Sequence, residues 1–381
     1  MFVGRIDRRH FVVAATALLL AGCKVIPAGP TVPPPPPPQG NLPGDQQRHR
    51  VALLVPLSGP NAAVGQAIAN ATTMALLDTN AKSIRITTYD TSDDPTAAAN
   101  RALIDGNKLF LGPVQGEEVR AVAAVAHGAH IPLIAYSSDA TLASRDVFVM
   151  GTTPDNSIRR TVSYARGHGA SRFGLLAPSG DYGSRASDAF AAAIKANGGS
   201  LIASVTYDRS NTSIVSAAQR LRSRGSFDAV LIADGSRFAV LAAPRLKAAG
   251  ATSPRLLGTE LWSGESAIAK TAALRGALFS AVSDARFRQF ADSYKTRFGT
   301  APYRLATLGY DSVLLTVRIA RDWRVGNPFP VARLTDQGGF LGLDGPFRFD
   351  AAGEIQRSLE VREARGTGVV VVSAAPDKFT D

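Results

Sequence analysis

An α/β fold with two lobes, each built on a parallel sheet, is what this sequence of 381 residues predicts. From residue 51 to residue 258, short apolar runs alternate with helical patterns. Alternation of this kind builds parallel sheets that are covered by helices on both faces. About 330 residues follow from Arg50 onward, which is more than one hydrophobic core usually organises, so we expect two lobes. The sequence shows no repeat of 20 to 50 residues, which argues against a solenoid.

The first half of the alternation ends near residue 136. A buried apolar run predicts the opening strand, and an alanine-rich helix follows a loop at 56–60. Asp94 followed by Pro95 predicts the start of another helix, because proline is favoured in a first turn. Gly112-Pro113 ends the third strand. The expected strands are 51–55, 84–89, 108–111 and 132–136, and the expected helices are 62–77, 95–105 and 119–126.

The second half repeats the pattern from residue 173 onward. The expected strands are 173–177, 201–207, 229–233 and 256–258, and the expected helices are 184–197, 213–222 and 238–249. Open parallel sheets place ligand-binding loops at the carboxyl ends of their strands. We therefore expect the functional residues in the loops that follow these strands.

The first 22 residues have the features of an export signal. Arginines precede an apolar stretch from Phe11 to Leu20, and Leu20-Ala21-Gly22-Cys23 ends it with the one cysteine of the chain. This ending resembles the bacterial lipobox, in which the cysteine is lipid-modified and becomes the first mature residue. The alternative is a chance cysteine in an ordinary signal peptide, or a buried thiol. Arg8-Arg9 leaves both Sec and twin-arginine export open.

A spacer follows the predicted lipid anchor. Residues 23–49 contain the lipidated Cys23 and a proline tract from Pro33 to Pro38, which predicts an extended, disordered linker. The formal net charge of +11 is scattered along the chain, and aromatic residues do not recur among the basic ones, which argues against nucleic acid as a partner. A basic surface suits anionic lipid or anionic cell-wall polymer.

Several short motifs match a family in order along the chain. They are Val55-Pro56-Leu57-Ser58-Gly59-Pro60, Tyr89-Asp90-Thr91, Leu111-Gly112-Pro113, Ile131-Pro132-Leu133-Ile134, Asp181-Tyr182-Gly183, Gly309-Tyr310-Asp311-Ser312 and Gly339–Gly345. Together they resemble type 1 periplasmic binding proteins of the leucine/isoleucine/valine group. The resemblance implies two Rossmann-like lobes with parallel sheets and an interlobe cleft. It divides the chain into lobe 1 at 50–153 and 283–335, and lobe 2 at 154–282 and 336–381.

A narrower resemblance is to the penicillin-binding-protein activators. These are outer-membrane lipoproteins that stimulate a peptidoglycan synthase. Lys24 after the cysteine, the long spacer and Leu257-Gly258-Thr259-Glu260-Leu261-Trp262 favour this group. It implies a lipoprotein that faces the periplasm, is held in the outer membrane and docks on a penicillin-binding protein. The alternative is a solute-binding receptor for an amino-acid ABC transporter, with a permease as its partner.

The family resemblance also implies a set of ligand-binding residues. Ser137 and Ser138 match the loop that holds an amino-acid carboxylate, Tyr182 matches an aromatic cover, and Glu260 matches the acid that pairs with the ammonium group. Ser236 stands near the position of a further family tyrosine, and Glu117 would repel a carboxylate. The structural alternatives are that the serines cap a helix, that Tyr182 packs on its own lobe and that Glu260 pairs with an arginine on the surface.

No enzyme signature accompanies these residues. The chain contains no P-loop, no Gly-x-Ser-x-Gly elbow and no Ser-x-x-Lys motif. His127 and His130 could supply two metal ligands, but a zinc site needs at least three protein ligands, so we expect no metal. Asp90, Asp93 and Asp94 are clustered carboxylates, but Asp94-Pro95 is better explained as the start of a helix than as part of a catalytic site. We therefore expect a non-catalytic binding protein that needs no cofactor.

Overall fold

The computed structural model describes residues 47–247 and 253–379. The predicted signal peptide, the lipidation of Cys23 and most of the linker lie outside the described residues. Among the described helices, none combines the length and the apolar character needed to cross a membrane.

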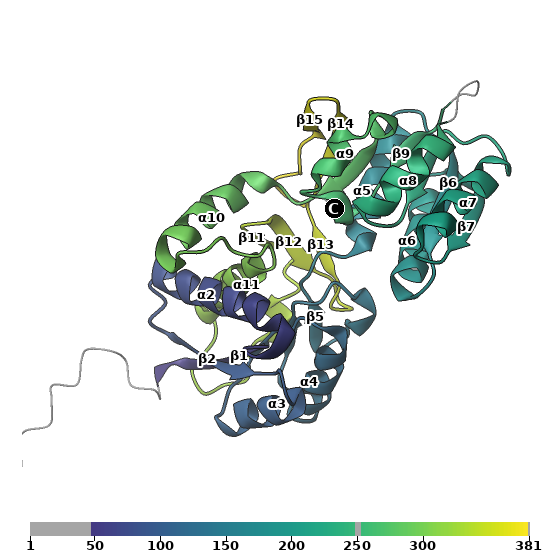
Figure 1. Cartoon of the computed structure of the whole chain (residues 1–381). Helices are drawn as coiled ribbons and strands as arrows, with labels where there is room; N and C mark the ends of the chain where they lie inside the picture. The colour runs from purple at the N-terminus through teal and green to yellow at the C-terminus, as the bar shows by residue number, and fades with distance from the viewer. Residues whose placement is uncertain (1–46, 248–252, 380–381) are drawn as a thin grey trace, which may run out of the picture. The chain divides into compact units, whose positions relative to one another are not determined.

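The first sheet, sheet A, has five parallel strands in the order β2-β1-β3-β4-β5. Figure 1 labels β1 and β2 of this sheet below helix α2. Its strands are β1 (His49–Val55), β2 (Ile84–Asp90), β3 (Phe110–Leu111), β4 (Leu133–Ala135) and β5 (Val147–Val149). The connecting helices are α2 (Ala62–Thr79), α3 (Pro95–Ile104) and α4 (Gly116–Gly128). The four expected strands and three expected helices of this half are confirmed, whereas the short edge strand β5 was not expected.

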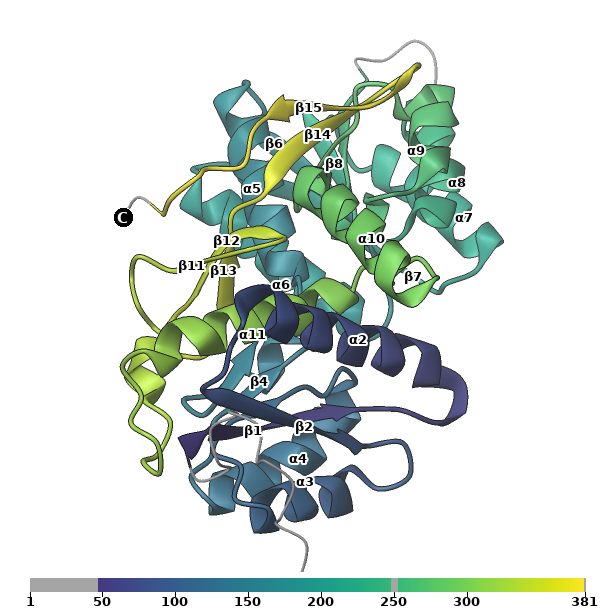
Figure 2. The same ribbon diagram turned by 90° about the vertical axis from the view of Figure 1, so that its left-hand side faces the viewer.

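Alternation along β1 explains why helices cover both faces of sheet A. Ala52 and Leu54 face a core cluster formed with α3 and α4. Leu53 and Val55 face the opposite cluster, which contains Ile68 of α2 and residues of α11 (Ala306–Ala320). Figure 2 shows α2 and α11 on one side of β1 and β2, and α3 and α4 on the other.

The second sheet, sheet B, has seven strands in the order β15-β14-β10-β9-β8-β6-β7. Its parallel strands are β6 (Arg172–Pro178), β7 (Ser200–Tyr207), β8 (Ala229–Ile232), β9 (Arg255–Leu257) and β10 (Leu278–Ala281). The last two strands, β14 (Glu360–Arg365) and β15 (Gly368–Ser373), are antiparallel additions. The expectation of parallel sheets therefore holds for sheet A and for most of sheet B.

Helices cover both faces of sheet B as well. One face packs against α5 (Pro154–Gly167) and α6 (Asp181–Ala196). The other packs against α7 (Asn211–Arg222), α8 (Ser236–Leu246) and α9 (Ser266–Lys270). Helix α6 begins at Asp181, one turn before the expected start, and α5 was not expected.

The chain returns to sheet A after β10. Helices α10 (Asp284–Phe298) and α11 come next, and α11 packs along α2. A small antiparallel sheet follows, with strands β11 (Phe340–Gly342), β12 (Gly345–Phe349) and β13 (Ile355–Arg357). This small sheet packs on the core of sheet A through Phe340, Phe347, Phe349 and Ile355. The last two strands, β14 and β15, complete sheet B. The division of the chain at residue 336 remains a prediction.

Two glycines allow helices α2 and α6 to pack closely against the loops that precede them. A Cβ atom on Gly65 of α2 would overlap the carbonyl oxygen of Pro56, and one on Gly183 of α6 would overlap that of Pro178. Only glycine allows these contacts, which fold the loops after β1 and β6 tightly over the helix starts. The expected helix start at Asp94 is also confirmed, since its carboxylate accepts a hydrogen bond from the Ala97 amide at 2.9 Å.

Candidate functional site

A cavity of about 750 Å³ lies where loops that follow strands of sheets A and B meet the segment after β10. Sheet A contributes Tyr136 and Ser138 after β4, and sheet B contributes Glu260 and Leu261 after β9. Tyr136 is fixed by a 2.8 Å hydrogen bond between its hydroxyl and that of Ser312 on α11. The remaining lining residues are Val114, Gly151, Thr152, Ser263, Gly264, Ala281, Val282, Asp284, Phe287, Arg288, Arg304, Leu305, Thr307, Leu308 and Asp344. The volume suits a small organic ligand.

Glu260 is a buried carboxyl on the cavity wall. It begins a short 3-10 helix (Glu260–Trp262), and its Oε1 accepts a 3.1 Å hydrogen bond from the Tyr182 hydroxyl. Its Oε2 is buried and has no hydrogen-bond partner among the described residues. Burial raises the pKa of Glu260 from 4.5 to about 7, and the negative charge of Asp155 adds to this effect. The carboxyl therefore has one oxygen whose hydrogen-bonding capacity no other described residue meets.

Tyr182 holds Glu260 from the start of α6. Its hydroxyl lies 2.9 Å from the Thr259 hydroxyl, which can donate a hydrogen bond to it while Tyr182 donates to Glu260. Burial, together with the charge of Glu260, raises the pKa of Tyr182. The ring packs against the core cluster of its own sheet, as the structural alternative expected. Tyr182 is not among the cavity-lining residues and reaches the cavity through Glu260.

The three serines predicted from the sequence occupy different environments. Ser138 is exposed and lines the cavity. Ser137 is buried, and its hydroxyl accepts a 3.1 Å hydrogen bond from the Asp139 amide, as a capping residue would. Ser236 begins α8 and donates a 2.8 Å hydrogen bond to Glu265. The structure thus brings Ser138 and Glu260 to one cavity, while Ser137 and Ser236 are not among its lining residues. Ligand binding by these residues remains a prediction.

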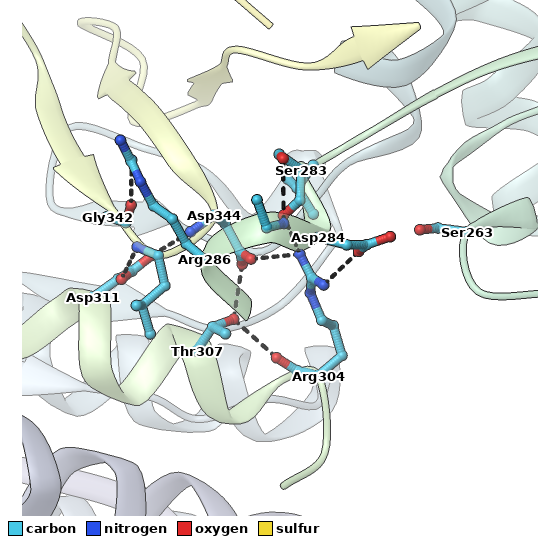
Figure 3. Close-up of polar contacts among 12 residues, drawn as sticks. Ser263, Ser283, Asp284, Arg286, Arg304, Thr307, Asp311, Gly342 and Asp344 are labelled. Carbon is cyan, nitrogen blue, oxygen red and sulfur yellow. Dashed lines mark hydrogen bonds and ion pairs between the residues drawn. The ribbon is translucent and has the colours of Figure 1, made fainter. Parts of the chain in front are cut away.

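An arginine-centred network that the sequence did not reveal forms another part of the wall (Figure 3). Arg304 donates from Nη1 to Asp284 and from Nη2 to Asp344, both at 2.8 Å. Thr307 also donates to Asp344, at 2.7 Å. The Arg304 guanidinium lies 4.2 Å from the ring centroid of Phe287. These contacts join the start of α10, the loop before α11 and the turn between β11 and β12.

Two further groups extend this network away from the cavity. Asp284 is also paired with Arg362 of β14 at 2.8 Å. Asp311 of α11 accepts a 2.7 Å hydrogen bond from the Leu343 amide, and burial followed by the charge of Asp344 raises its pKa. Asp311 lies in the motif Gly309–Ser312, and Asp344 lies in the motif Gly339–Gly345. The family resemblance included both segments but assigned neither residue a role.

The remaining candidates have structural partners. Nδ1 of His127 lies 2.5 Å from a carboxylate oxygen of Asp146. Asp90 accepts hydrogen bonds from the Leu57 amide at 2.8 Å and from the Ser92 hydroxyl at 2.6 Å. Within the described ranges, no three His, Cys, Asp or Glu side chains gather in a way that could hold a metal ion.

Trp262 is fully buried and donates a 2.9 Å hydrogen bond from Nε1 to the carbonyl of Asp234. It anchors the loop after β9, which places Glu260 at the cavity.

Comparisons with known proteins agree with this architecture. The family model described as periplasmic binding protein matches residues 49–368. A putative branched-chain amino acid ABC transporter protein of Rhodospirillum rubrum has a TM-score of 0.74 at 20% identity, covering 85% of this chain and 100% of that one. A leucine-binding protein of Thermotoga maritima has a TM-score of 0.60 at 19% identity, covering 86% and 98%.

A substrate-binding protein of Desulfitobacterium hafniense in complex with leucine has a TM-score of 0.64 at 17% identity, covering 85% of this chain and 100% of that one. Among curated proteins, an uncharacterised protein of Rickettsia prowazekii is 30% identical over 140 residues. That match spans 36% of this chain and 38% of the relative. The chain belongs to the periplasmic binding protein family, and its fold is that of the type 1 group that includes leucine-binding proteins.

Proposed function

We propose that this protein is the solute-binding component of an ABC transporter and delivers a small amine-bearing ligand from its cavity to a permease. The observation that carries the proposal is Glu260, a carboxyl on the cavity wall with one oxygen held by Tyr182 and the other buried without a partner. Such an oxygen gains most from a ligand that donates a hydrogen bond and carries a positive charge.

The cavity wall supports a ligand with an apolar body. Val114, Leu261, Val282, Phe287 and Leu305 contribute apolar surface beside Glu260. Similar folds serve different ligands, since one structural neighbour holds leucine and another, from Rhodopseudomonas palustris, holds 3,4-dihydroxybenzoic acid. The cavity wall of this protein favours an amine joined to an aliphatic group.

The test is thermal unfolding of the protein with three matched probes. These are leucine, isopentylamine, and 2-hydroxy-4-methylpentanoate, which replaces the amine of leucine with a hydroxyl. A probe at about 100 times its Kd should add roughly 2.7 kcal/mol of stability. We expect both amines to stabilise the protein and the hydroxy acid to bind at least about tenfold more weakly.

Variants then assign the effect to the carboxyl. Glu260→Gln should weaken amine binding about 100-fold, since a charge-assisted hydrogen bond is lost. Glu117→Gln, an exposed carboxylate that is not among the cavity-lining residues, is the matched control and should leave binding unchanged. Equal binding of the hydroxy acid, or a Glu260→Gln variant that binds amines as tightly as the wild type, would contradict the proposal.

A second candidate is a lipoprotein that regulates peptidoglycan synthesis by docking on a penicillin-binding protein. The specific observation in its favour is that two family ligand positions, Ser137 and Ser236, carry internal hydrogen bonds. In this proposal the protein faces the periplasm and is anchored through Cys23, with Lys24 directing it to the outer membrane. Purification with no synthase, and an unchanged rate of glycan polymerisation on adding the protein, would refute it. Release from the membrane by Cys23→Ser tests the anchor for either candidate.

A further inference from the structure

A second, smaller cavity lies at the opposite end of β1 from the candidate ligand site. It has a volume of about 150 Å³ and lies beside the start of β1, the turn after α3 and the turn after α11. Its lining residues are Arg48, His49, Arg50, Gly106, Lys108, Trp323, Val325 and Gly326. Four of these eight are basic and none is acidic. Pockets for whole metabolites run to roughly 300–1,000 Å³, so this one suits a single small group.

Two nitrogen atoms of this cavity lack partners among the described residues. The Nε atom of Arg48 and the Nδ1 atom of His49 are both buried and lack a hydrogen-bond partner among the described residues. His49 is only 4% exposed, and its ring stacks on that of Trp323 with centroids 3.9 Å apart. A buried donor without a partner, such as Arg48 Nε, is rare in folded proteins because it costs free energy. The Nδ1 atom of His49 donates only in one tautomer, and burial lowers the pKa of that ring. The arginine donor points to a ligand that accepts hydrogen bonds.

Nearby acidic residues already have other partners. Asp105 accepts a 2.7 Å hydrogen bond from the Tyr89 hydroxyl, and Asp322 pairs with Arg333 at 3.0 Å. Arg50 donates a 2.8 Å hydrogen bond to the backbone carbonyl of Asp105, which ends α3. Arg50 therefore has a structural role. The side chains of Arg48 and Lys108 have no hydrogen bond or ion pair to another described residue that would give them such a role.

We propose that the cavity formed by Arg48, His49, Arg50 and Lys108 binds a phosphate group. Guanidinium and ammonium donors converging on a small space match a tetrahedral oxyanion with several acceptor oxygens. The phosphate can come from a free anion or from the headgroup of an anionic lipid. A lipid headgroup fits the position of Arg48, which follows the predicted tether and directly precedes β1. The competing explanation is that these residues only cap the ends of α3 and α11.

The experiment is calorimetric titration of the full-length chain carrying Cys23→Ser, with inorganic phosphate and with acetate as probes. We expect phosphate to bind and acetate to bind at least about tenfold more weakly. Lys108→Gln and Arg48→Gln should each weaken phosphate binding about tenfold, because each removes a charge-assisted hydrogen bond. Arg220→Gln, an exposed residue of α7, changes the net charge equally and should have no effect. Lys108 is exposed, so its variant tests the site even where Arg48→Gln folds poorly.

Vesicles separate the two sources of phosphate. Flotation with phosphatidylglycerol vesicles, compared with phosphatidylcholine vesicles, tests the headgroup. Anionic vesicle binding that Lys108→Gln weakens and Arg220→Gln does not would assign the site to lipid. Phosphate binding without such vesicle binding would assign it to a free anion. The absence of phosphate binding, equal binding of acetate, or affinity unchanged in both cavity variants would overturn the proposal and leave helix capping as the role of these residues.

Discussion

Replacing Glu260 with glutamine should stabilise the ligand-free protein, and more so at high pH. Burial raises the pKa of this carboxyl from 4.5 to about 7. At about 1.4 kcal/mol for each tenfold change in proton affinity, the ionised carboxylate costs the folded protein up to about 3 kcal/mol. Below pH 4.5 the carboxyl is protonated in both the folded and the unfolded chain, so the cost is absent. Between pH 4.5 and 7 only the unfolded chain ionises and the free energy of unfolding falls, and above pH 7 the cost is complete.

Urea unfolding of the wild type and the variant at pH 5 and pH 8 measures this difference. The free energy of unfolding that Glu260→Gln adds should be about 2 kcal/mol larger at pH 8 than at pH 5. Glu117→Gln, an exposed carboxylate, should show no such dependence. The reasoning is refuted if Glu260→Gln changes stability equally at the two pH values, or if it destabilises the protein at pH 8.

Three further predictions concern the same wall and the helix contacts. Arg304→Gln should destabilise the protein by about 3 kcal/mol in urea, because it leaves a buried carboxylate without its ion pair, whereas the exposed Arg318→Gln should cost less than about 1 kcal/mol. Gly65→Ala should lower the unfolding temperature strongly because its Cβ would overlap a backbone carbonyl, and Gly167→Ala, with open space around it, should not. Tyr182→Phe removes a donor to the site carboxylate, so a pH titration of ligand binding should show its apparent pKa moving upward. An unchanged midpoint would contradict the assigned hydrogen bond.

Much of the fold was predictable because several of its strands are apolar and α3 begins with a clear signal at Asp94-Pro95. The runs at 51–55 and 229–233 contain only apolar residues, so each stands out as a buried strand. Strand β14 was not predicted because two of its buried residues, Glu360 and Arg362, are charged. They form an ion pair in which the Arg362 Nε lies 2.7 Å from a carboxylate oxygen of Glu360. A pattern search for apolar residues does not detect a strand whose buried positions are charged.

The site was predictable only in part, for a related reason. Ser138 and Glu260 follow strands of parallel sheets, and the rule on carboxyl ends places such residues at a ligand site. Arg304 follows no strand, and its partners Asp284 and Asp344 are distant in the sequence. Its place on the wall depends on how α10, α11 and the small third sheet pack together, which local patterns do not encode.

The antiparallel strands that complete sheet B have a consequence for the order in which the protein can fold. Synthesis proceeds from the N-terminus, so β6 to β10 leave the ribosome long before β14 and β15. Until then β10 is a bare edge that can pair with another chain. The face of sheet A that packs against α11 likewise stays uncovered until α11 has been synthesised. Sheet B is completed, and this face of sheet A is covered, only after β10 has been made, so the last steps of folding depend on slow, long-range contacts.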